Sequence, residues 1–195
     1  MKTDKSASVF IHPTAVVDQG AIIGLGTKVW HFCHIMSQSK IGSGCILGQN
    51  VFVANGVIIG DRVKIQNNVS LYDGVLLDDD VFVGPSAVFT NVLNPRAHVE
   101  RKDEYRPTKV GKGATIGANA VIVCGHKIGE YAMVGAGSVV TKDISAFSLV
   151  YGNPAVHRAW VSRAGERLEF EDGAYASCPR TGEKYKRTEA GVRLL

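Results

Sequence analysis

The sequence lacks the features that would assign it to a membrane or secreted class. No apolar stretch approaches the roughly 20 residues that a membrane-spanning helix needs. Residues 1–8 contain no apolar run of the kind found in a signal peptide. We therefore expect a cytoplasmic protein that does not associate with membranes.

The chain also lacks a large excess of positive or negative charge. The formal net charge is only +4, aromatic residues make up 8% of the chain, and the basic residues are scattered rather than gathered in a stripe with aromatics. This pattern does not favour nucleic-acid binding, whose usual mark is a basic patch. Small anionic molecules remain possible partners.

Cysteine is limited to four residues, Cys33, Cys45, Cys124 and Cys178. We expect free structural thiols, because nothing in their spacing pairs them. The segment 178–182, Cys-Pro-Arg-Thr-Gly, is similar to half of a zinc knuckle, but no second Cys-x-x-Cys completes four ligands. We predict no metal site in the tail or elsewhere.

The sequence does contain a strict period of six. Fourteen consecutive units run from Ile11 to Asn94, and each opens on an aliphatic residue or Phe. The opening residues are Ile11, Val17, Ile23, Val29, Ile35, Ile41, Leu47, Val53, Ile59, Ile65, Leu71, Leu77, Val83 and Phe89. The fifth residue of each unit is mostly small or β-branched, so two positions in six point inward.

This period predicts a β-solenoid. Two inward positions per six residues suit a short strand followed by a corner, whereas a helix would place apolar residues every three to four positions and would be weakened by the frequent glycines. Repeats of this kind stack as layers of one continuous core. Three units, or eighteen residues, make one triangular coil.

The period is interrupted once and then ends. Six further units begin at Val110 after a gap at 95–109, which we interpret as an inserted loop. Residues 159–195 lose the period and become charged. We therefore expect a β-solenoid domain at 1–158 and a small helical or hairpin appendage at 159–195 that covers one end.

Residues eighteen apart form columns on the outer surface, because successive coils stack about 4.8 Å apart. One polar column contains His31, Gln49 and Asn67, and a second contains Asn55, Asp73 and Asn91. Both are candidate ligand sites. Asn91 is the stronger candidate, because it begins the departure into the loop and loops on rigid scaffolds commonly carry functional groups.

A structural explanation stays open for these columns. Asn and Asp suit tight corners, since they tolerate unusual backbone angles and bond locally. His31 and His34 can equally be surface residues. His126 falls at a fifth position, and we expect it to lie toward the interior or a corner as a packed, hydrogen-bonded side chain.

Two segments near the end of the solenoid resemble a known family. The segment 128–144 followed by Tyr-Gly-Asn-Pro-Ala at 151–155 is similar to the final coils and exit segment of hexapeptide-repeat acetyltransferases. The resemblance covers roughly residues 10–158 and implies a left-handed parallel β-helix. Handedness rests on the resemblance alone, because parallel crossovers are ordinarily right-handed.

The same resemblance implies a co-substrate and an assembly. In that family acetyl-CoA lies in the cleft between subunits of a homotrimer. The implied contacts here are Ala118 and Ala136 beside the pantetheine arm, with Lys142, Pro154 and Arg158 near the nucleotide end. Small residues admit an extended arm, and cationic side chains can bind phosphate.

A narrower resemblance involves segments 29–34, 48–53 and 88–96. They are similar to bacterial N-acetyltransferases that act on UDP-2-acetamido-3-amino-2,3-dideoxy-glucuronate, for surface polysaccharide biosynthesis. The resemblance implies a UDP-linked amino sugar as acceptor, and it extends over nearly the whole chain.

One departure from the wider family bears on mechanism. Its members that acetylate hydroxyl groups usually carry a His-Pro pair in the loop, and the corresponding pair here is Asn94-Pro95. Asparagine cannot act as a general base, whereas a neutral amine needs none, because it already has a lone pair. We therefore expect direct attack by an amine, with Asn91 orienting the amine or the developing oxyanion.

Cationic residues of the loop are candidate contacts for pyrophosphate or a uronate carboxylate. Arg96 and Arg106 flank the loop and are our choices among Arg96, His98, Arg101, Lys102 and Arg106. Together with His31, Gln49, Asn67 and Asp73 they form the predicted substrate-binding set.

Three rival functions remain. An O-acetyltransferase could use His98 or His31 as its base. A metal hydratase on the same fold would need three histidines, yet Asn67 and Ser70 stand two coils beyond His31 and His34. A non-catalytic binding scaffold is the third, since a fold alone does not prove an activity.

Overall fold

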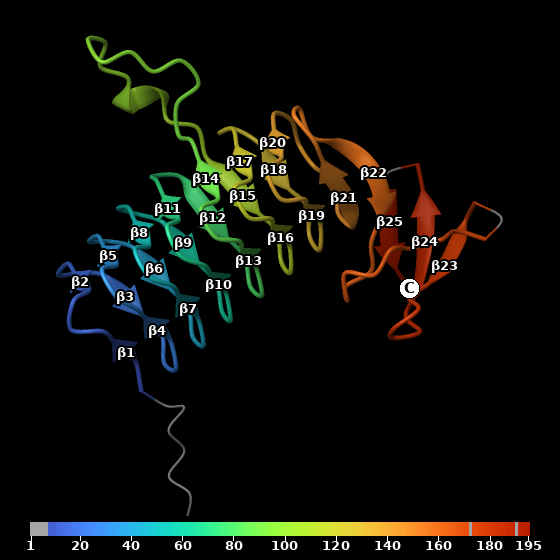
Figure 1. The fold of residues 1–195 in the computed structure, drawn as a ribbon, viewed down its shortest axis with the longest axis horizontal. Coiled ribbons are helices and arrows are strands. Elements are labelled where there is room, and N and C mark those ends of the chain that lie inside the picture. The colour runs from blue at the N-terminus through green and yellow to red at the C-terminus, as the bar shows by residue number, and fades with distance from the viewer. Residues whose placement is uncertain (1–7, 172, 190) are drawn as a thin grey trace, which may run out of the picture.

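The computed structural model describes residues 8–171, 173–189 and 191–195. Most of the chain is a triangular prism of stacked coils (Figure 1). Strands three apart in the sequence pair in parallel, so each coil contributes one strand to each of three sheets. The predicted left-handed parallel β-helix is therefore confirmed.

Face A is the nine-stranded sheet and ends in an antiparallel strand. Its strands are β1 (Phe10–Ile11), β4 (Lys28–Val29), β7 (Ile46–Leu47), β10 (Lys64–Ile65), β13 (Phe82–Val83), β16 (Thr115–Ile116), β19 (Met133–Val134), β21 (Ser148–Tyr151) and β22 (Val156–Trp160).

Face B is the seven-stranded sheet. It contains β2 (Val16–Val17), β5 (His34–Ile35), β8 (Phe52–Val53), β11 (Ser70–Leu71), β14 (Val88–Phe89), β17 (Val121–Ile122) and β20 (Val139–Val140).

Face C is the six-stranded sheet. It contains β3 (Ile22–Ile23), β6 (Lys40–Ile41), β9 (Ile58–Ile59), β12 (Val75–Leu77), β15 (Thr108–Val110) and β18 (Lys127–Ile128). We name the corners of the prism by the faces they join: edge AB, edge BC and edge CA.

The core is one column of inward side chains along the prism axis. From Val29 onward the first residue of each hexad is buried, and Val29, Leu47 and Ile65 have no exposed surface, whereas Ile11 in the first coil is 42% exposed. The fifth residue fills the corner space, and Cys33 and Cys45 there are buried, with the pKa of each thiol raised by burial.

The corners require an unusual backbone at the fourth residue of the hexad. Most fourth residues have a positive φ, including Asn50 at 59° and Asn68 at 60°. Asparagine and glycine adopt this region at little cost, whereas Phe32 and Tyr131 hold it against their preference. The period of six is therefore a period of corner geometry as well as of hydrophobicity.

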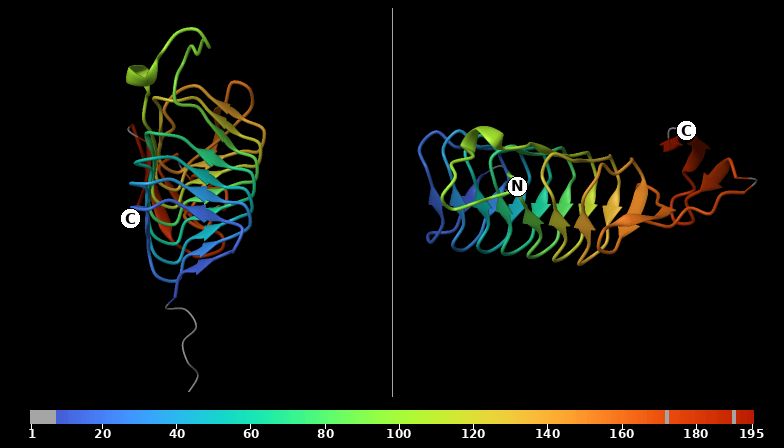
Figure 2. Two further views of the ribbon diagram at one scale, coloured as in Figure 1. Left: turned by 90° about the vertical axis from the view of Figure 1, so that its left-hand side faces the viewer. Right: turned by 90° about the horizontal axis from the view of Figure 1, so that it is seen from above.

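The loop leaves edge BC after β14 and projects from the prism (Figures 1 and 2). It contains the short 3-10 helix η1 (Lys102–Glu104). Thr108 and Lys109 fall within the loop expected at 95–109, but in the structure they belong to β15 and pair with β12. Thr108 is buried, which explains why the solenoid resumes before Val110.

The C-terminal segment forms an antiparallel sheet of β23 (Tyr175–Ser177), β24 (Lys184–Thr188) and β25 (Gly191–Leu194). No α-helix occurs between residue 159 and the C-terminus where the chain is described. The expected boundary after residue 158 falls inside β22, because that strand continues face A beyond β21.

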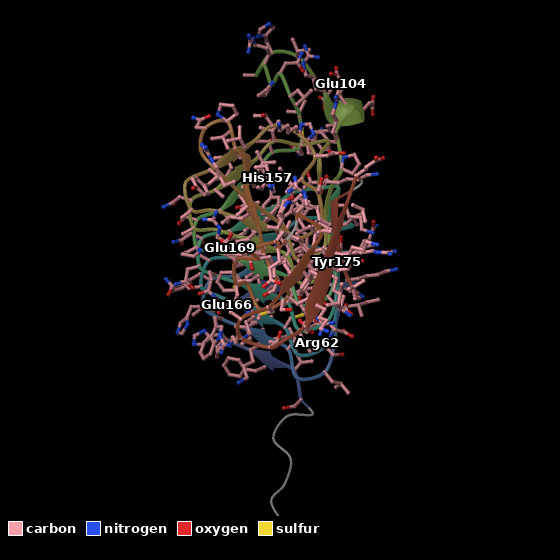
Figure 3. The ribbon with its side chains drawn as sticks, turned by 90° about the vertical axis from the view of Figure 1, so that its right-hand side faces the viewer. Arg62, Glu104, His157, Glu166, Glu169 and Tyr175 are labelled. Atoms are coloured by element: carbon pink, nitrogen blue, oxygen red, sulfur yellow. The ribbon has the colours of Figure 1, made fainter. Side chains whose placement is uncertain are left out.

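The appendage has its own small core, which is centred on Phe147 and Tyr185 and joined to Tyr131 of the last coils. It lies at the end of the prism opposite β1 (Figure 2). Side-chain sticks show Tyr175 on its strand (Figure 3), and that ring is 52% exposed. The buried Cys178 has its sulfur 3.1 Å from the Ser162 hydroxyl.

Candidate functional site

Part of the predicted substrate set and part of the predicted cofactor set lie on the same edge of the prism. Face A pairs Lys28 with Ile46, Ile46 with Lys64, Lys64 with Phe82, Phe82 with Thr115, and Thr115 with Met133. Three residues further along, edge AB therefore carries one row: His31, Gln49, Asn67, Pro85, Ala118 and Ala136. The N-terminal half of the row consists of polar residues, and the C-terminal half consists of small residues.

Part of the polar half is structural. The side-chain oxygen of Asn67 accepts a hydrogen bond of 2.8 Å from the backbone N–H of Gln49, so it fixes the corner of the preceding coil. His31 stacks on His12 with ring centroids 3.5 Å apart. Loss of hydration and the neighbouring His31 lower the pKa of His12.

The second column runs along edge BC. Ser70 pairs with Phe52 and with Val88, which puts Asn55, Asp73 and Asn91 in one row. The row continues through Cys124 to Lys142, because Val88 pairs with Val121 and Val121 with Val139. Lys142 therefore lies two coils beyond Asn91 and on a different edge from Ala118 and Ala136.

Asn91 lies at the neck of the loop. Its carbonyl oxygen accepts a hydrogen bond of 2.8 Å from the backbone N–H of Arg106. The side chain is half-buried and lines a hollow of about 310 Å³ beside Arg96 and Tyr105. Asn91 and Arg96 therefore line one hollow, whereas Arg106 meets Asn91 through its backbone and lines a separate hollow with Leu93 and Asn94.

The other cations of the loop are neutralised within it. Arg101 donates to both carboxylate oxygens of Glu104 at 2.7 and 2.9 Å, and Lys102 lies 3.1 Å from Glu100. Glu104 lies on the short helix away from the prism (Figure 3). Arg96 and Arg106 form no ion pair with any carboxylate in the described residues.

Pro154 and Arg158 lie at the C-terminal end of edge AB. β21 pairs with β19, so Gly152 continues the row of Ala118 and Ala136, and Pro154 follows it closely. The Arg158 guanidinium lies over the Tyr151 ring, 5.0 Å from its centroid. A cation beside this edge can bind a phosphate group.

One protomer cannot bring the two edges together. Asn91 and Lys142 lie on edge BC, whereas Ala118, Ala136 and Pro154 lie on or near edge AB. Face B separates the edges, and a hexad in extended form spans up to roughly 20 Å.

Apart from the stacked pair of His12 and His31, two further histidines lie beside carboxylates rather than beside one another. His34 lies 3.2 Å from Asp18, and His126 lies 3.4 Å from Asp143 with 26% of its side chain exposed, at a corner rather than in the core. No group of three or more His, Cys, Asp or Glu side chains that could hold a metal ion occurs in the part of the chain that the structure describes.

The sequence reasoning missed two side chains beside edge AB. A hollow of about 300 Å³ lies at Gly48, and its lining includes Trp30 and Gln66. The available signal was positional: Trp30 and Gln66 are second residues of hexads, where most units of this edge carry glycine.

Two repeat models match the chain. "Bacterial transferase hexapeptide (six repeats)" matches residues 20–55 and 107–142, and "Hexapeptide repeat of succinyl-transferase" matches residues 39–73. A curated relative from Aneurinibacillus thermoaerophilus, dTDP-3-amino-3,6-dideoxy-alpha-D-galactopyranose 3-N-acetyltransferase, is 43% identical over 194 residues, which are 99% of this chain and 98% of the relative. The chain belongs to the hexapeptide-repeat acetyltransferase family.

Solved structures place this acetyltransferase among similar folds. The acetyltransferase domain of PglB from Neisseria gonorrhoeae FA1090, solved with acetyl coenzyme A, is 25% identical with a TM-score of 0.53, and the match covers 78% of this chain and 58% of that one. A GDP-perosamine N-acetyltransferase from Caulobacter crescentus is 24% identical with a TM-score of 0.53, and the match covers 79% of this chain and 58% of that one. This match shows a similarity of fold alone.

The A. thermoaerophilus relative supports the sugar N-acetyltransferase part of the resemblance but not its UDP-linked uronate. It is a sugar N-acetyltransferase, as expected, but its named sugar is a dTDP-linked 6-deoxyhexose rather than a UDP-linked uronate. The two sugars share an amino group at position three.

A membrane-spanning role for a helix is not supported in this acetyltransferase. Among the residues with described coordinates, none of the helices has the length and apolar character to cross a bilayer.

Proposed function

We propose that this acetyltransferase transfers the acetyl group of acetyl-CoA to the 3-amino group of a nucleotide-linked sugar. The observation that carries the proposal is the 43% identity, over almost the full length of both chains, to an enzyme named for this reaction on a dTDP-linked sugar. Asn94-Pro95 agrees with it, because asparagine stands where relatives that acetylate hydroxyl groups carry the histidine of a His-Pro pair.

Two nucleotide-linked sugars that carry a 3-amino group are candidate acceptors. A dTDP-linked 3-amino-3,6-dideoxyhexose is the first, by likeness to the A. thermoaerophilus relative. A UDP-linked 2-acetamido-3-amino uronate is the second, since Arg96 and Arg106 have no carboxylate partner in the described chain and can pair with a uronate. Either product would serve surface polysaccharide biosynthesis, in the cytoplasm.

The site is built between copies of the chain. The strands of face B carry no Lys, Arg, Asp or Glu, whereas faces A and C each present lysines. Three prisms arranged about a three-fold axis with face B inward set edge AB of one copy beside edge BC of the next. Such a homotrimer brings Ala118 and Ala136 opposite the neighbouring copy's Asn91 and Lys142.

The order of the coils divides this cleft between the two substrates. Asn91 belongs to the fifth coil, level with Pro85 on edge AB, because β13 and β14 are strands of the same coil. Acetyl-CoA would extend toward the C-terminal coils, past Ala118 and Ala136 to Pro154, Arg158 and Lys142. The nucleotide sugar would occupy the N-terminal coils at His31, Gln49, Asn67 and Asp73.

The chemistry then needs alignment more than a base. The nitrogen of the neutral amine attacks the thioester carbonyl, the carbon–sulfur bond breaks, and the departing CoA sulfur takes the proton released by nitrogen. Alignment of two reactants can contribute roughly 7 to 11 kcal/mol. Asn91 orients the amine or donates to the developing oxyanion, an interaction that can add about 3 kcal/mol.

The rival O-acetyltransferase has weaker geometric support. His31 is stacked on His12 in the second coil, about three coil rises from the level of Asn91. His98 lies exposed in the projecting loop. Neither histidine is level with the small residues of edge AB.

A panel of acceptors tests the proposal by release of the free thiol of CoA. We expect turnover with dTDP-3-amino-3,6-dideoxyhexose or with the UDP-amino uronate, and none with matched sugars that carry a 3-hydroxyl. Equal turnover of the hydroxyl sugars, abolished by His98→Ala, would establish the O-acetyltransferase instead. Absence of acetyl-CoA binding in calorimetry would leave a binding scaffold.

A further inference from the structure

Trp30 stands in a column beside edge AB that carries glycine at four of its seven positions. The second residues of the hexads that follow face A are His12, Trp30, Gly48, Gln66, Gly84, Gly117 and Gly135. At Gly48 an added Cβ would lie 2.5 Å from the Asn67 side-chain oxygen, so coil stacking itself excludes a side chain there. No such requirement explains an indole at position 30.

Beyond the Gly48 backbone, a slot on the outer surface is lined by Trp30, Gln49, Gln66 and Asn67. Trp30 belongs to the second coil and Gln66 to the fourth, about 9.6 Å apart by two coil rises. The slot has a volume of about 300 Å³. This separation admits one planar ring stacked at van der Waals distance on the indole, with room for an amide on its other side.

The indole is held in place but remains accessible. It is 39% exposed, lies within 7° of the plane of His31, and contacts Phe10 with ring centroids 5.4 Å apart. An aromatic face fixed by its neighbours and open to solvent can stack a nucleobase, and such stacking is sequence-tolerant because every base has a π-face.

Amide groups surround the same slot. Gln66 and Gln49 make no side-chain hydrogen bond in the described residues, and Asn67 uses only its oxygen, toward the Gln49 N–H. Amides offer both a donor and an acceptor, which matches the alternating carbonyl and N–H groups of uracil and thymine. The larger hollow on the other side of Trp30 is lined by Leu25, Phe10 and other mainly apolar residues and offers no such groups.

We propose that the slot over Gly48 binds the pyrimidine base of the nucleotide sugar, stacked on Trp30 and hydrogen-bonded by Gln49, Gln66 and Asn67. This assignment rests on the proposed function for the identity of the ligand. It places the base about two coil rises from the level of Asn91, and the diphosphate and sugar span that distance.

Fluorescence tests the assignment directly, because the chain has only two tryptophans, Trp30 and Trp160. In a Trp160→Phe variant, UDP and dTDP should quench the remaining emission, whereas CoA should not. Calorimetry with Trp30→Ala should show UDP and dTDP binding weakened by roughly tenfold or more. Gln66→Ala should weaken the same binding. Because it removes no aromatic packing, it tests the assignment even if Trp30→Ala proves unstable.

Steady-state kinetics supply the second readout. The KM for the nucleotide sugar should rise in Trp30→Ala, with little change in kcat or in the KM for acetyl-CoA. Unchanged UDP and dTDP binding in both variants would overturn the assignment, as would quenching by CoA or equal quenching by ADP. Binding of UDP needs no acetyl transfer, so failure of the proposed reaction would be seen separately from failure of this site.

Discussion

The backbone N–H of Arg106 donates a 2.8 Å hydrogen bond to the carbonyl oxygen of Asn91, and this bond closes the neck of the inserted loop. Fourteen residues lie between the two in the chain, yet both border the point where the loop leaves edge BC. This bond uses the backbone carbonyl of Asn91 and not its side chain. Asn91 can therefore present its amide to a ligand from a rigid position.

Replacement of Asn91 by Ala should lower kcat by roughly a hundredfold with little change in thermal stability. The expected loss is that of one oxyanion donor or orienting amide, and the carbonyl that bonds Arg106 is retained. Single-turnover acetyl transfer measures it. An unchanged rate would remove Asn91 from the mechanism.

Replacement of Arg96 by Ala should raise the KM for the nucleotide sugar by about tenfold and leave the KM for acetyl-CoA unchanged. A hydrogen bond to a charged group contributes roughly 1.5 to 3 kcal/mol, and Arg96 forms no ion pair in the described chain that would be lost instead. Arg101→Ala is the matched control, because Arg101 is already paired with Glu104. Equal effects of the two changes would contradict the contact.

A cation on face B should dissociate the assembly, and a cation on face C should not. Val88 on face B and Ile58 on face C are each 46% exposed, so they offer matched sites. We expect Val88→Arg to reduce the mass in light scattering from a trimer to a monomer and to abolish turnover, because the cleft needs two copies. Ile58→Arg should leave both unchanged.

The contrary result, a trimer that survives Val88→Arg but not Ile58→Arg, would move the interface to face C. In that arrangement edges AB and BC of neighbouring copies would no longer meet. The pairing of Ala118 with the neighbouring Asn91 would then be wrong.

The Arg62–Asp80 pair predicts a pH-dependent contribution to stability. Arg62 donates hydrogen bonds of 2.7 and 3.0 Å to Asp80, which lowers the pKa of that carboxyl below its ordinary value of 3.8. A lowered folded-state pKa stabilises the fold above the unfolded value, and the contribution is lost as pH falls through the folded one. The loss should therefore begin below about pH 4.

Asp80→Asn tests this point with little strain, because Asn tolerates the φ of 60° at this corner. The variant should melt slightly below the wild type at pH 7, and the two melting temperatures should converge as the pH falls below 4. The difference should be small, since both side chains are partly exposed. A difference that grew in acid would contradict the assignment.

Much of the fold could be predicted from sequence, because a period of six repeats one local geometry through most of the chain. The same two positions of each hexad point inward, so Val29, Leu47 and Ile65 could be assigned to the core without knowledge of their neighbours. The columns followed from the same arithmetic, which is why the row from His31 to Asn67 and the row from Asn55 to Asn91 both appear as expected.

Features outside the six-residue period were harder to predict from the sequence. The tail has no repeated unit, so the sequence left helix and hairpin open, and only the pairing of β23, β24 and β25 settled it. The ion pairs of the loop could not be predicted either. Arg101 and Arg96 are both arginines of the same loop, yet within the described residues Arg101 pairs with a carboxylate and Arg96 does not.

The sequence by itself determined the coil, because inward hydrophobic positions and corner residues are properties of single hexads that add along the chain. Only the tertiary structure decided which residues face one another. The register across the loop joined Ala118 to the row of His31, and the stacking of the coils placed Trp30 and Gln66 around a slot at Gly48. Such relations depend on stacking between distant segments, a cooperative outcome that no local pattern contains.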